Sequence, residues 1–372
     1  MKVQLLDLKA QYAPFREEIS KMVLEIMDSQ YFIGGPYVKE CEETVAKYSH
    51  TNNCVGCSSG SDAIIISLLA LGIKPGDEVI VPSFTFFATA GAVAIIGAKP
   101  VFVDVHDDTF NIDHRCVEKA ITPRTKAIIA VDLYGQTADL DKIKEIAKKH
   151  NIGFIEDAAQ SIGAEYKGKR VGEIADLTTI SFYPAKNLGA FGDAGAVLTN
   201  SDELKQKLVM LREHGSSDRY FHKVVGMNAR LDAIQAAIIV KKITKLDDWT
   251  NARQRNANIY FDAFKKAGLS DFVITPKVAE YTTRHIFNQF VIRVQKRDEL
   301  KNYLQSKEIA SAVFYPLGLH MQDCFKYTGS KEGDLPITEK LCKEVLALPI
   351  YPELTKEQLE YVVNSIRDFY RN

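Results

Sequence analysis

Short apolar runs rich in β-branched residues alternate with helix-like stretches through the first two-thirds of this chain. The strand-like runs are EVIVPS, KPVFVDV, KAIIAVDLYG, IGFIEDAA and TTISFYP. Helical patterning is found in SDAIIISLLALGI, ATAGAVAIIGA and DLDKIKEIAKKH. Strands that alternate with helices form βαβ units, so the pattern predicts an α/β fold with a mostly parallel sheet covered by helices on both faces.

Polar residues stand at the ends of these strand-like runs. The runs end at Ser83, Asp104, Asp132, Asp157 and Ser181. The carboxyl ends of parallel strands meet at one edge of a sheet, and ligands of open α/β sheets bind beyond that edge. We therefore predict the functional site there.

The pattern changes from about Leu231 onward. A long helical stretch, LDAIQAAIIVKKITKLDDWTNARQRNANIYFDAFKKAG, suggests one connecting helix or two helices in series. It is followed by a strand-like IFNQFVIRV, a helix-like RDELKNYLQSKE, a second strand near ASAVFYP and closing helices. A chain of 372 residues is long enough for two domains. We predict a large domain over residues 1–248 and a small C-terminal α+β domain over residues 249–372.

The charge balance and the apolar segments limit the partners. Lys plus Arg total 47 and Asp plus Glu total 48, so the net charge of −1 favours no polyanion and nucleic acid is not an expected partner. The start of the chain meets Asp7 and Lys9 before any signal-peptide run, and GAVAIIGAKPVFVDV is interrupted by Lys99, Pro100 and Asp104. We expect a cytoplasmic protein with no membrane contact.

Six scattered cysteines favour reduced thiols over a disulfide framework. The pair in NCVGCSSG has C-x-x-C spacing, but no second ligand pair accompanies it. We interpret this segment as a buried strand running into a loop, and we expect no metal site.

A single lysine, Lys186, lies in the stretch SFYPAKNLGAFGDAGA. A lysine held in apolar surroundings loses solvation of its charged form, so its pKa falls and its amine becomes available as a nucleophile or Schiff-base partner. The alternative is a solvated lysine at the edge of a loop. This stretch alone does not separate the two.

Two other segments supply companions for this lysine. In GCSSGSDAIIISLL a Gly-Ser turn precedes a helix with Asp62 in its first turn, which suits either a bound phosphate or an ordinary helix cap. FIEDAAQSIGA ends a strand with Asp157 and, three residues later, Gln160. Lys186 follows Asp157 by 29 residues, one strand further on, which predicts neighbouring places on the same edge. Together these groups are what pyridoxal phosphate requires.

An ordered set of motifs extends this interpretation to a family. The chain resembles the DegT/DnrJ/EryC1/StrS family of sugar aminotransferases in SSGSDA, PSFTFFATA, GAKPVFVDV, LYGQTADLD, IEDAAQSIGA, SFYPAKNLGAFGDAGAV, GMNARLDAIQAA and ALPIYPEL. The resemblance runs from the first residues to near the C-terminus. It implies a fold-type-I pyridoxal phosphate enzyme acting on nucleotide-linked keto-sugars.

The resemblance also implies roles for single residues. Lys186 forms the Schiff base with the cofactor, Asp157 pairs with the pyridine nitrogen, Gln160 lies beside the ring and Phe86 stacks on it. The remaining residues implied by the resemblance bind the phosphate or the sugar nucleotide. For the phosphate they are Gly60, Ser61, Ser181 and, from the neighbouring subunit, Asn228; for the sugar nucleotide they are Arg230, Tyr315 and His320. The active sites would therefore be shared within a homodimer.

The sequence departs from the family pattern at two of its positions. Ser61 replaces the usual threonine and keeps its hydroxyl group. Phe314 stands where many relatives carry histidine or tyrosine, which removes a polar contact. Family members that became dehydratases have lost the lysine to histidine, so Lys186 favours transamination.

By resemblance we expect L-glutamate as amino donor and the C3 keto group of a UDP-N-acetylglucosamine-derived sugar, or its uronic acid, as acceptor. Such a product would serve cell-surface polysaccharide or lipopolysaccharide synthesis. The alternatives are a dTDP-3-keto-6-deoxyhexose, a 4-keto-sugar, and a non-catalytic regulatory protein that retains the fold. A nicotinamide-dependent oxidoreductase is disfavoured because GAFGDAG differs in spacing and position from G-x-G-x-x-G.

Overall fold

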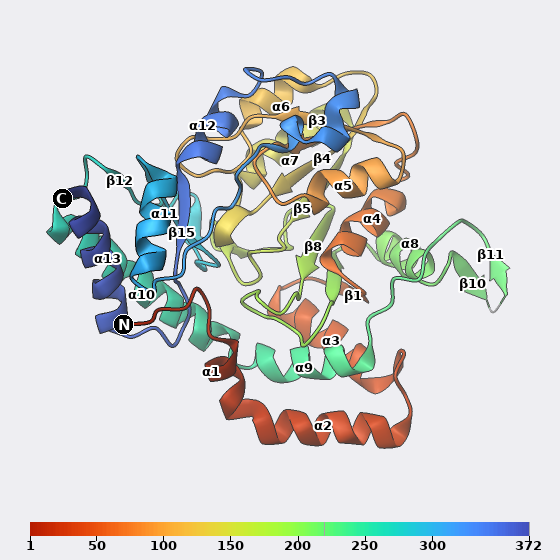
Figure 1. The fold of residues 1–372 in the computed structure, drawn as a ribbon. Coiled ribbons are helices and arrows are strands. Elements are labelled where there is room, and N and C mark those ends of the chain that lie inside the picture. Colours follow the sequence, from red (N-terminus) through yellow and green to blue (C-terminus); the bar gives the residue numbers. More distant parts are fainter. Residues whose placement is uncertain (219, 372) are drawn as a thin grey trace.

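A seven-stranded sheet forms the centre of the described chain, in the order β1-β9-β8-β5-β4-β2-β3 (Figure 1). The structure is a computed structural model that describes residues 1–218 and 220–371. The strands of this sheet are β1 (Asn53–Cys57), β2 (Glu78–Pro82), β3 (Lys99–Val103), β4 (Thr125–Val131), β5 (Gly153–Asp157), β8 (Leu177–Ser181) and β9 (Gly195–Thr199). Strand β9 runs antiparallel to β1 and β8, while β3, β2, β4, β5 and β8 pair in parallel. The predicted mostly parallel α/β fold is confirmed.

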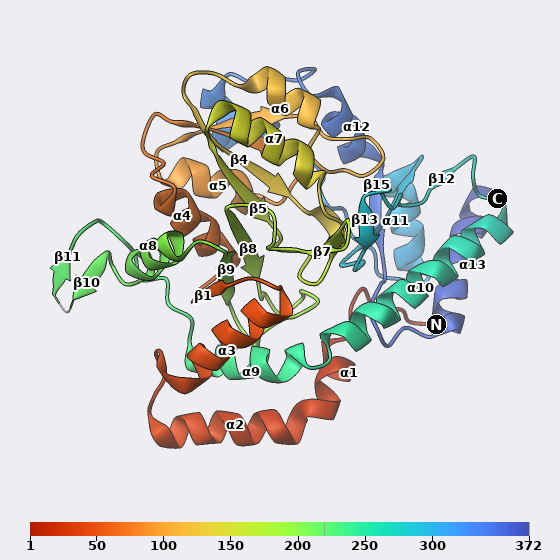
Figure 2. The same cartoon turned by 180° about the vertical axis from the view of Figure 1, so that it is seen from behind.

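Helices cover both faces of this sheet because its strands are apolar on both sides. Val79 and Val81 pack with the helices of one face, whereas Ile80 between them packs with those of the other, as the two-residue period of a strand requires. The first face carries α4 (Gly60–Ala70), α5 (Ala88–Ile95) and α8 (Asp202–Arg212). The opposite face carries α3 (Gly35–Tyr48), α6 (His114–Ala120), α7 (Leu140–His150) and α9 (Ala233–Ile243), several of which lie in front in Figure 2.

The N-terminal segment forms helices on the outside of the molecule before the chain reaches the first strand of the sheet. It forms α1 (Leu8–Tyr12), a short 3-10 helix (Ala13–Phe15) and α2 (Arg16–Ser29), and α2 lies beside α9 in both views (Figures 1 and 2). Further 3-10 turns occur at Leu133–Gly135, Leu319–Met321 and Asp323–Thr328. Among the residues that the structure describes, no helix has both the length and the apolar character needed to cross a membrane.

The C-terminal part is built on a three-stranded antiparallel sheet in the order β12-β14-β15. Its elements are α10 (Leu246–Ala267), β12 (Val273–Ile274), β13 (Thr282–Arg284), β14 (Phe290–Val294), α11 (Arg297–Ser306), α12 (Pro336–Glu344), β15 (Val345–Leu348) and α13 (Lys356–Arg371). The long predicted helix is two helices in series, since α9 ends before α10 begins. The strand expected near ASAVFYP contributes only an isolated bridge between Ala312 and Ala347 in the described chain. The fully buried β15 pairs with β14 instead.

The predicted domain boundary at 248/249 falls inside α10. The first residues of the chain lie against the C-terminal part: Val3 donates a backbone hydrogen bond of 3.0 Å to Glu308 and is buried in the same core as Tyr260 and Phe290. Burial of this valine explains why the N-terminus and the C-terminus lie on the same side of the molecule (Figure 1). The division into two domains stays a prediction.

Two small hairpins complete the chain. Strands β6 (Glu165–Tyr166) and β7 (Lys169–Arg170) join β13 in a sheet of their own. Strands β10 (Ser216–Asp218) and β11 (Phe221–His222) form a hairpin that extends away from the body of the molecule (Figure 1).

Candidate active site

Lys186 and Asp157 come together at the carboxyl edge of the central sheet. Asp157 is the last residue of β5, and Lys186 lies in the turn that follows the neighbouring strand β8. Burial lowers the pKa of the Lys186 amine from 10.5 to about 8, while the nearby Asp157 carboxylate acts in the opposite direction. A lysine with this pKa has a substantial neutral fraction at mildly basic pH, as nucleophilic chemistry requires.

Asp157 is buried and surrounded by hydrogen-bond donors. It accepts from Thr89 Oγ1 at 2.8 Å, from the Ala159 N–H at 3.2 Å and from Thr179 Oγ1 at 3.5 Å. Burial raises the pKa of this carboxyl group, whereas the donors and the Lys186 charge favour its ionised form. A cationic ring nitrogen bound at this carboxylate would favour ionisation further.

The start of α4 meets the end of β8 in a narrow turn. Ser59 caps the helix by accepting from the Asp62 N–H at 3.1 Å. A Cβ atom on Gly60 would lie 2.7 Å from Ser181 Cβ, and one on Gly195 would collide with the Ser59 carbonyl oxygen. The absence of these side chains leaves the N–H groups of a helix start beside the Ser181 hydroxyl. This arrangement suits a phosphate group.

The predicted phosphate-binding residues are therefore partly assembled. Gly60 abuts Ser181, and Ser61 is exposed in the first turn of α4. Asn228 is exposed and lies in an isolated bridge with Glu213. Its contact with the phosphate of a neighbouring subunit stays a prediction.

Three predicted ring-binding and substrate-binding residues lie together. Gln160 accepts a 2.7 Å bond from the Tyr134 N–H and donates a 3.2 Å bond to Tyr315 Oη. The ring centroids of Phe86 and Tyr315 are 6.3 Å apart, and Phe86 is 58% exposed. An exposed phenylalanine here leaves an apolar ring face open to a ligand.

Arg230 and His320 lie in different surroundings. Arg230 is half-buried, its backbone bridges to Cys57 at the end of β1, and its Nη1 lies 3.4 Å from Glu213 Oε2. His320 is 1% exposed, with Nδ1 at 2.7 Å from Ser83 Oγ and Nε2 at 3.2 Å from Glu339 Oε1. Both ring nitrogens of His320 therefore already have protein partners, and its contact with a sugar nucleotide stays a prediction.

Two residues that support this site, Thr89 and Lys242, were not predicted from the sequence. Thr89 lies within the quoted motif PSFTFFATA, but only the folded chain brings it to Asp157. Lys242 is buried on α9, and its Nζ donates to the carbonyl oxygen of Gly189, three residues after Lys186. Its position on the apolar side of an otherwise apolar helix is the signal that would have identified it.

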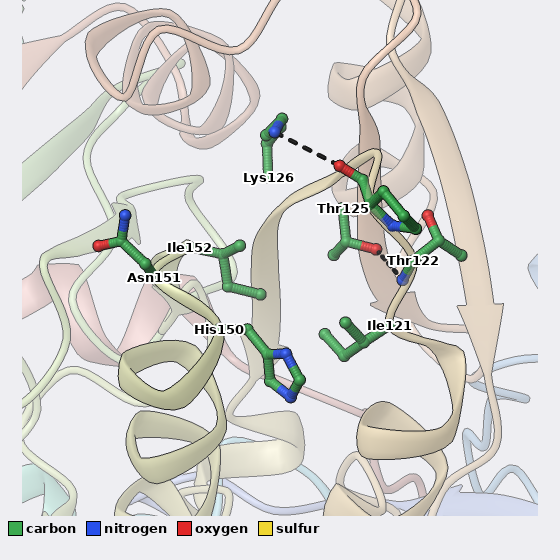
Figure 3. Close-up of a pocket in the computed structure, with 8 residues that line it drawn as sticks. Ile121, Thr122, Thr125, Lys126, His150, Asn151 and Ile152 are labelled. Carbon is green, nitrogen blue, oxygen red and sulfur yellow. Dashed lines mark hydrogen bonds between the residues drawn. The ribbon is translucent and has the colours of Figure 1, made fainter.

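Two other candidate centres were found outside the group formed by Lys186 and Asp157. His106, Asp113 and His114 place possible ligand atoms within 4.8 Å of one another, but both Asp113 oxygens already accept from Arg115. The pocket in Figure 3, about 490 Å³ in volume, lies at the opposite, amino-terminal ends of β4 and β5. It is lined by Ile121, Thr122, Pro123, Thr125, Lys126, His150, Asn151 and Ile152.

The C-x-x-C pair lies inside strand β1. Cys54 and Cys57 are buried free thiols, and burial raises the pKa of each. A thiol with a raised pKa is a poor nucleophile and a poor metal ligand. Their burial agrees with the interpretation of this segment as a strand.

Known proteins resemble this chain over its whole length. A "Pleiotropic regulatory protein" of Geobacillus stearothermophilus is 51% identical over all of both chains. A UDP-N-acetyl-3-dehydro-alpha-D-glucosamine 3-aminotransferase of Acidithiobacillus ferrooxidans is 44% identical, covering 98% of this chain and 97% of the relative. A dTDP-3-amino-3,4,6-trideoxy-alpha-D-glucose transaminase of Streptomyces venezuelae is 40% identical, covering 99% and 96%.

A solved structure matches the fold equally well. S. venezuelae DesV, in complex with a ketimine intermediate, superposes with a TM-score of 0.95 at 40% identity, covering 100% of this chain and 99% of that one. The DegT/DnrJ/EryC1/StrS aminotransferase family matches residues 14–367. The family match, the relatives and the fold agree, and the chain belongs to the DegT/DnrJ/EryC1/StrS aminotransferase family.

Proposed function

We propose that this aminotransferase uses pyridoxal phosphate to move the amino group of L-glutamate to the C3 keto group of a nucleotide-linked sugar. The proposed acceptor is a UDP-N-acetylglucosamine-derived 3-keto sugar or its uronic acid, for cell-surface polysaccharide or lipopolysaccharide synthesis. The observation that carries this proposal is the Lys186 amine, with its lowered pKa, beside Asp157. The relative from A. ferrooxidans, named for a UDP-linked 3-keto sugar, supports this choice of acceptor.

The residues present fit pyridoxal phosphate. When bound, the cofactor supplies an electron sink for the carbanion formed at the donor's α-carbon. Lys186 would hold its aldehyde carbon and Asp157 its ring nitrogen. Gly60 and Gly195 have no side chains and so leave room for its phosphate. The backbone N–H groups at the start of α4 and the Ser181 hydroxyl would donate to it.

The chain's own groups perform the proton chemistry. The Lys186 amine would remove the donor's α-proton and later return a proton, so it would act as general base and general acid. Its lowered pKa brings it close to the working pH, where such a group is most effective. Asp157 in its ionised form holds a proton on the ring nitrogen.

We infer that two copies of the chain complete each site. Large aromatic side chains around the Lys186 turn are exposed in the single chain: Phe86 is 58%, Tyr183 55% and Phe191 46% exposed. Apolar groups gathered at one place favour burial against another chain. The exposed side chain of Asn228 is available for the neighbouring subunit.

A panel of nucleotide-linked keto-sugars tests the acceptor. Glutamate-dependent amination is measured with UDP-linked 3-keto, dTDP-linked 3-keto and 4-keto sugars, with Lys186→Ala as the inactive control. We expect the highest kcat/KM with a UDP-linked 3-keto sugar. Activity on a 4-keto sugar together with failure on every 3-keto sugar would overturn the proposal.

The name of the relative from G. stearothermophilus favours a second candidate, a regulatory protein that retains the fold. Cofactor binding separates the two functions. The enzyme should turn yellow with pyridoxal phosphate, and borohydride should fix the cofactor on the Lys186 peptide. Protein that stays colourless with added cofactor and forms no such adduct would support the regulatory function alone.

A further inference from the structure

The residue next to Lys186 is locked in place by a buried amide pair. Asn187 is 2% exposed, and its Nδ2 donates to the Ile286 carbonyl oxygen at 3.1 Å. Its Oδ1 accepts from Asn288 Nδ2 at 2.8 Å. Because both ends of the amide are bonded, its orientation is fixed, and with it the backbone on which Lys186 stands.

The segment 286–289 that receives Asn187 is also bonded to the chain behind the predicted cofactor ring. The Ile286 N–H donates to the Gly135 carbonyl oxygen at 2.9 Å, and the Gln289 N–H donates to that of Tyr134 at 3.3 Å. Tyr134 in turn donates its N–H to Gln160 Oε1. Segment 286–289 is therefore bonded both to Asn187 in the Lys186 turn and to the backbone of Tyr134, which in turn binds Gln160.

A buried guanidinium group holds the same segment from the C-terminal side. Arg253 is 2% exposed, and its Nη1 donates to the carbonyl oxygens of Phe287, Asn288 and Ile350 at 3.1, 3.4 and 2.8 Å. Burial lowers the pKa of Arg253 to about 10. A buried cation is costly to leave unpaired, and Nη1 finds its partners in these three carbonyl oxygens, while Nε has none among the described residues. Loss of the three bonds would be costly, which favours a fixed position of the segment.

We propose that Asn187 and Asn288 are positioning residues that set the Lys186 amine relative to Gln160 through segment 286–289. The inference rests on the proposed role of Lys186. A misplacement of about 1 Å at a reacting group lowers the rate about a hundredfold. The amide pair links the turn to the segment side chain to side chain and joins residues 101 positions apart in the chain, beside the bond from Asn187 to the Ile286 carbonyl oxygen.

The experiment compares Asn187→Ala, Asn288→Ala and the double variant with a matched control, Asn256→Ala. Asn256 is also a buried asparagine, and its Nδ2 donates at 2.8 Å to the carbonyl oxygen of Tyr351, a residue outside segment 286–289. Each single variant removes one buried amide, so the losses of unfolding free energy of the three single variants should be similar. Asn288→Asp, which keeps the shape but replaces the donor by an acceptor, serves if an alanine variant does not fold.

Two readouts are taken: kcat of the holoenzyme, and the pH dependence of Lys186 modification by an amine reagent in cofactor-free protein. We expect Asn187→Ala and Asn288→Ala each to lower kcat about a hundredfold. The Lys186 pKa should rise from about 8 toward that of a solvated lysine. The double variant should be no worse than either single variant, and Asn256→Ala should match wild type in both readouts.

Several results would overturn the inference. They are kcat and Lys186 titration in Asn288→Ala equal to those of Asn256→Ala, or losses that add in the double variant. Wild-type activity in Lys186→Ala would instead overturn the proposed function, so the two failures are distinguishable.

Discussion

Thr89 Oγ1 donates a 2.8 Å hydrogen bond to Asp157 Oδ2. Thr89 lies in the first turn of α5, whereas Asp157 ends β5, and the two are 68 positions apart in the chain. Both residues are buried, so water does not compete for the bond. The hydroxyl group therefore stabilises the ionised carboxylate on which the proposed chemistry depends.

Thr89→Val, which keeps the shape and removes the hydroxyl, should move the acid limb of the pH profile of kcat/KM upward by about one pH unit. The Thr89 bond lowers the pKa of Asp157, so its loss raises that pKa. Activity that needs the ionised form is then lost at a higher pH. Thr250→Val is the control, because Thr250 is buried and its hydroxyl has no hydrogen-bond partner among the residues that the structure describes. An acid limb equal to that of the control contradicts the prediction.

Asp157→Asn should lower the pKa of Lys186 below its wild-type value of about 8 in cofactor-free protein, since the Asp157 charge favours the ammonium form. The pH dependence of Lys186 modification measures this shift. The variant should still bind pyridoxal phosphate but lose most turnover, because the ring nitrogen no longer has an anionic partner. An unchanged or higher Lys186 pKa would show that the two groups do not interact.

The alternation of strands and helices was sufficient to predict the α/β fold and the edge that holds Lys186 and Asp157. Both residues stand at or just after strand ends, where local pattern and topology agree. Thr89 could not be predicted as their partner, because its approach depends on the strand order β5-β4-β2. Sequence alternation leaves that order open.

Contacts between distant segments explain why the second C-terminal strand and the burial of His320 differ from expectation. ASAVFYP and VLALPI are both apolar, and only the folded chain shows that the second supplies β15 beside β14. His320 lies in a short polar interruption of the sequence, but Ser83 and Glu339 come from distant segments to bury it. Burial that depends on distant partners is not encoded in local pattern.

Gly60→Ala should weaken the binding of pyridoxal phosphate at least about tenfold, a loss of about 1.4 kcal/mol. The added methyl group would lie 2.7 Å from Ser181 Cβ and would fill the turn proposed for the phosphate. Alanine is a better helix former than glycine, so helix propensity does not account for a loss. The dissociation constant is measured by equilibrium dialysis of cofactor-free protein.

Gly192→Ala is the matched control for this variant. The atoms nearest to a Cβ at Gly192 belong to the flexible end of Gln235, with Nε2 at 3.2 Å. Its affinity for the cofactor should equal that of wild type. Equal affinities for all three proteins would show that the phosphate does not bind at the turn of Gly60 and Ser181.

Lys242→Met should change how stability depends on pH. Lys242 is 3% exposed, its Nζ donates to the Gly189 carbonyl oxygen, and the rings of Phe191 and Trp249 lie 5.5 and 5.8 Å from that nitrogen. Burial lowers its pKa from 10.5 to about 8. Below pH 8 the folded chain therefore bears the full cost of the buried charge, and this cost disappears as the pH rises toward 10.5.

The lowered pKa of Lys242 corresponds to a cost of about 3 kcal/mol in the free energy of unfolding when the buried amine is charged. Lys242→Met has no charge at this position and therefore no such cost. Urea unfolding of both proteins at a series of pH values measures the difference. Between pH 7.5 and 10.5 the free energy of unfolding of wild type should rise by about 3 kcal/mol relative to Lys242→Met. Lys245→Met is the control: Lys245 is exposed at the N-cap of α10, immediately before Leu246, and the variant should keep a constant difference from wild type. A constant difference for Lys242→Met as well would mean that the Lys242 amine is solvated, and that the turn carrying Lys186 is not closed over it.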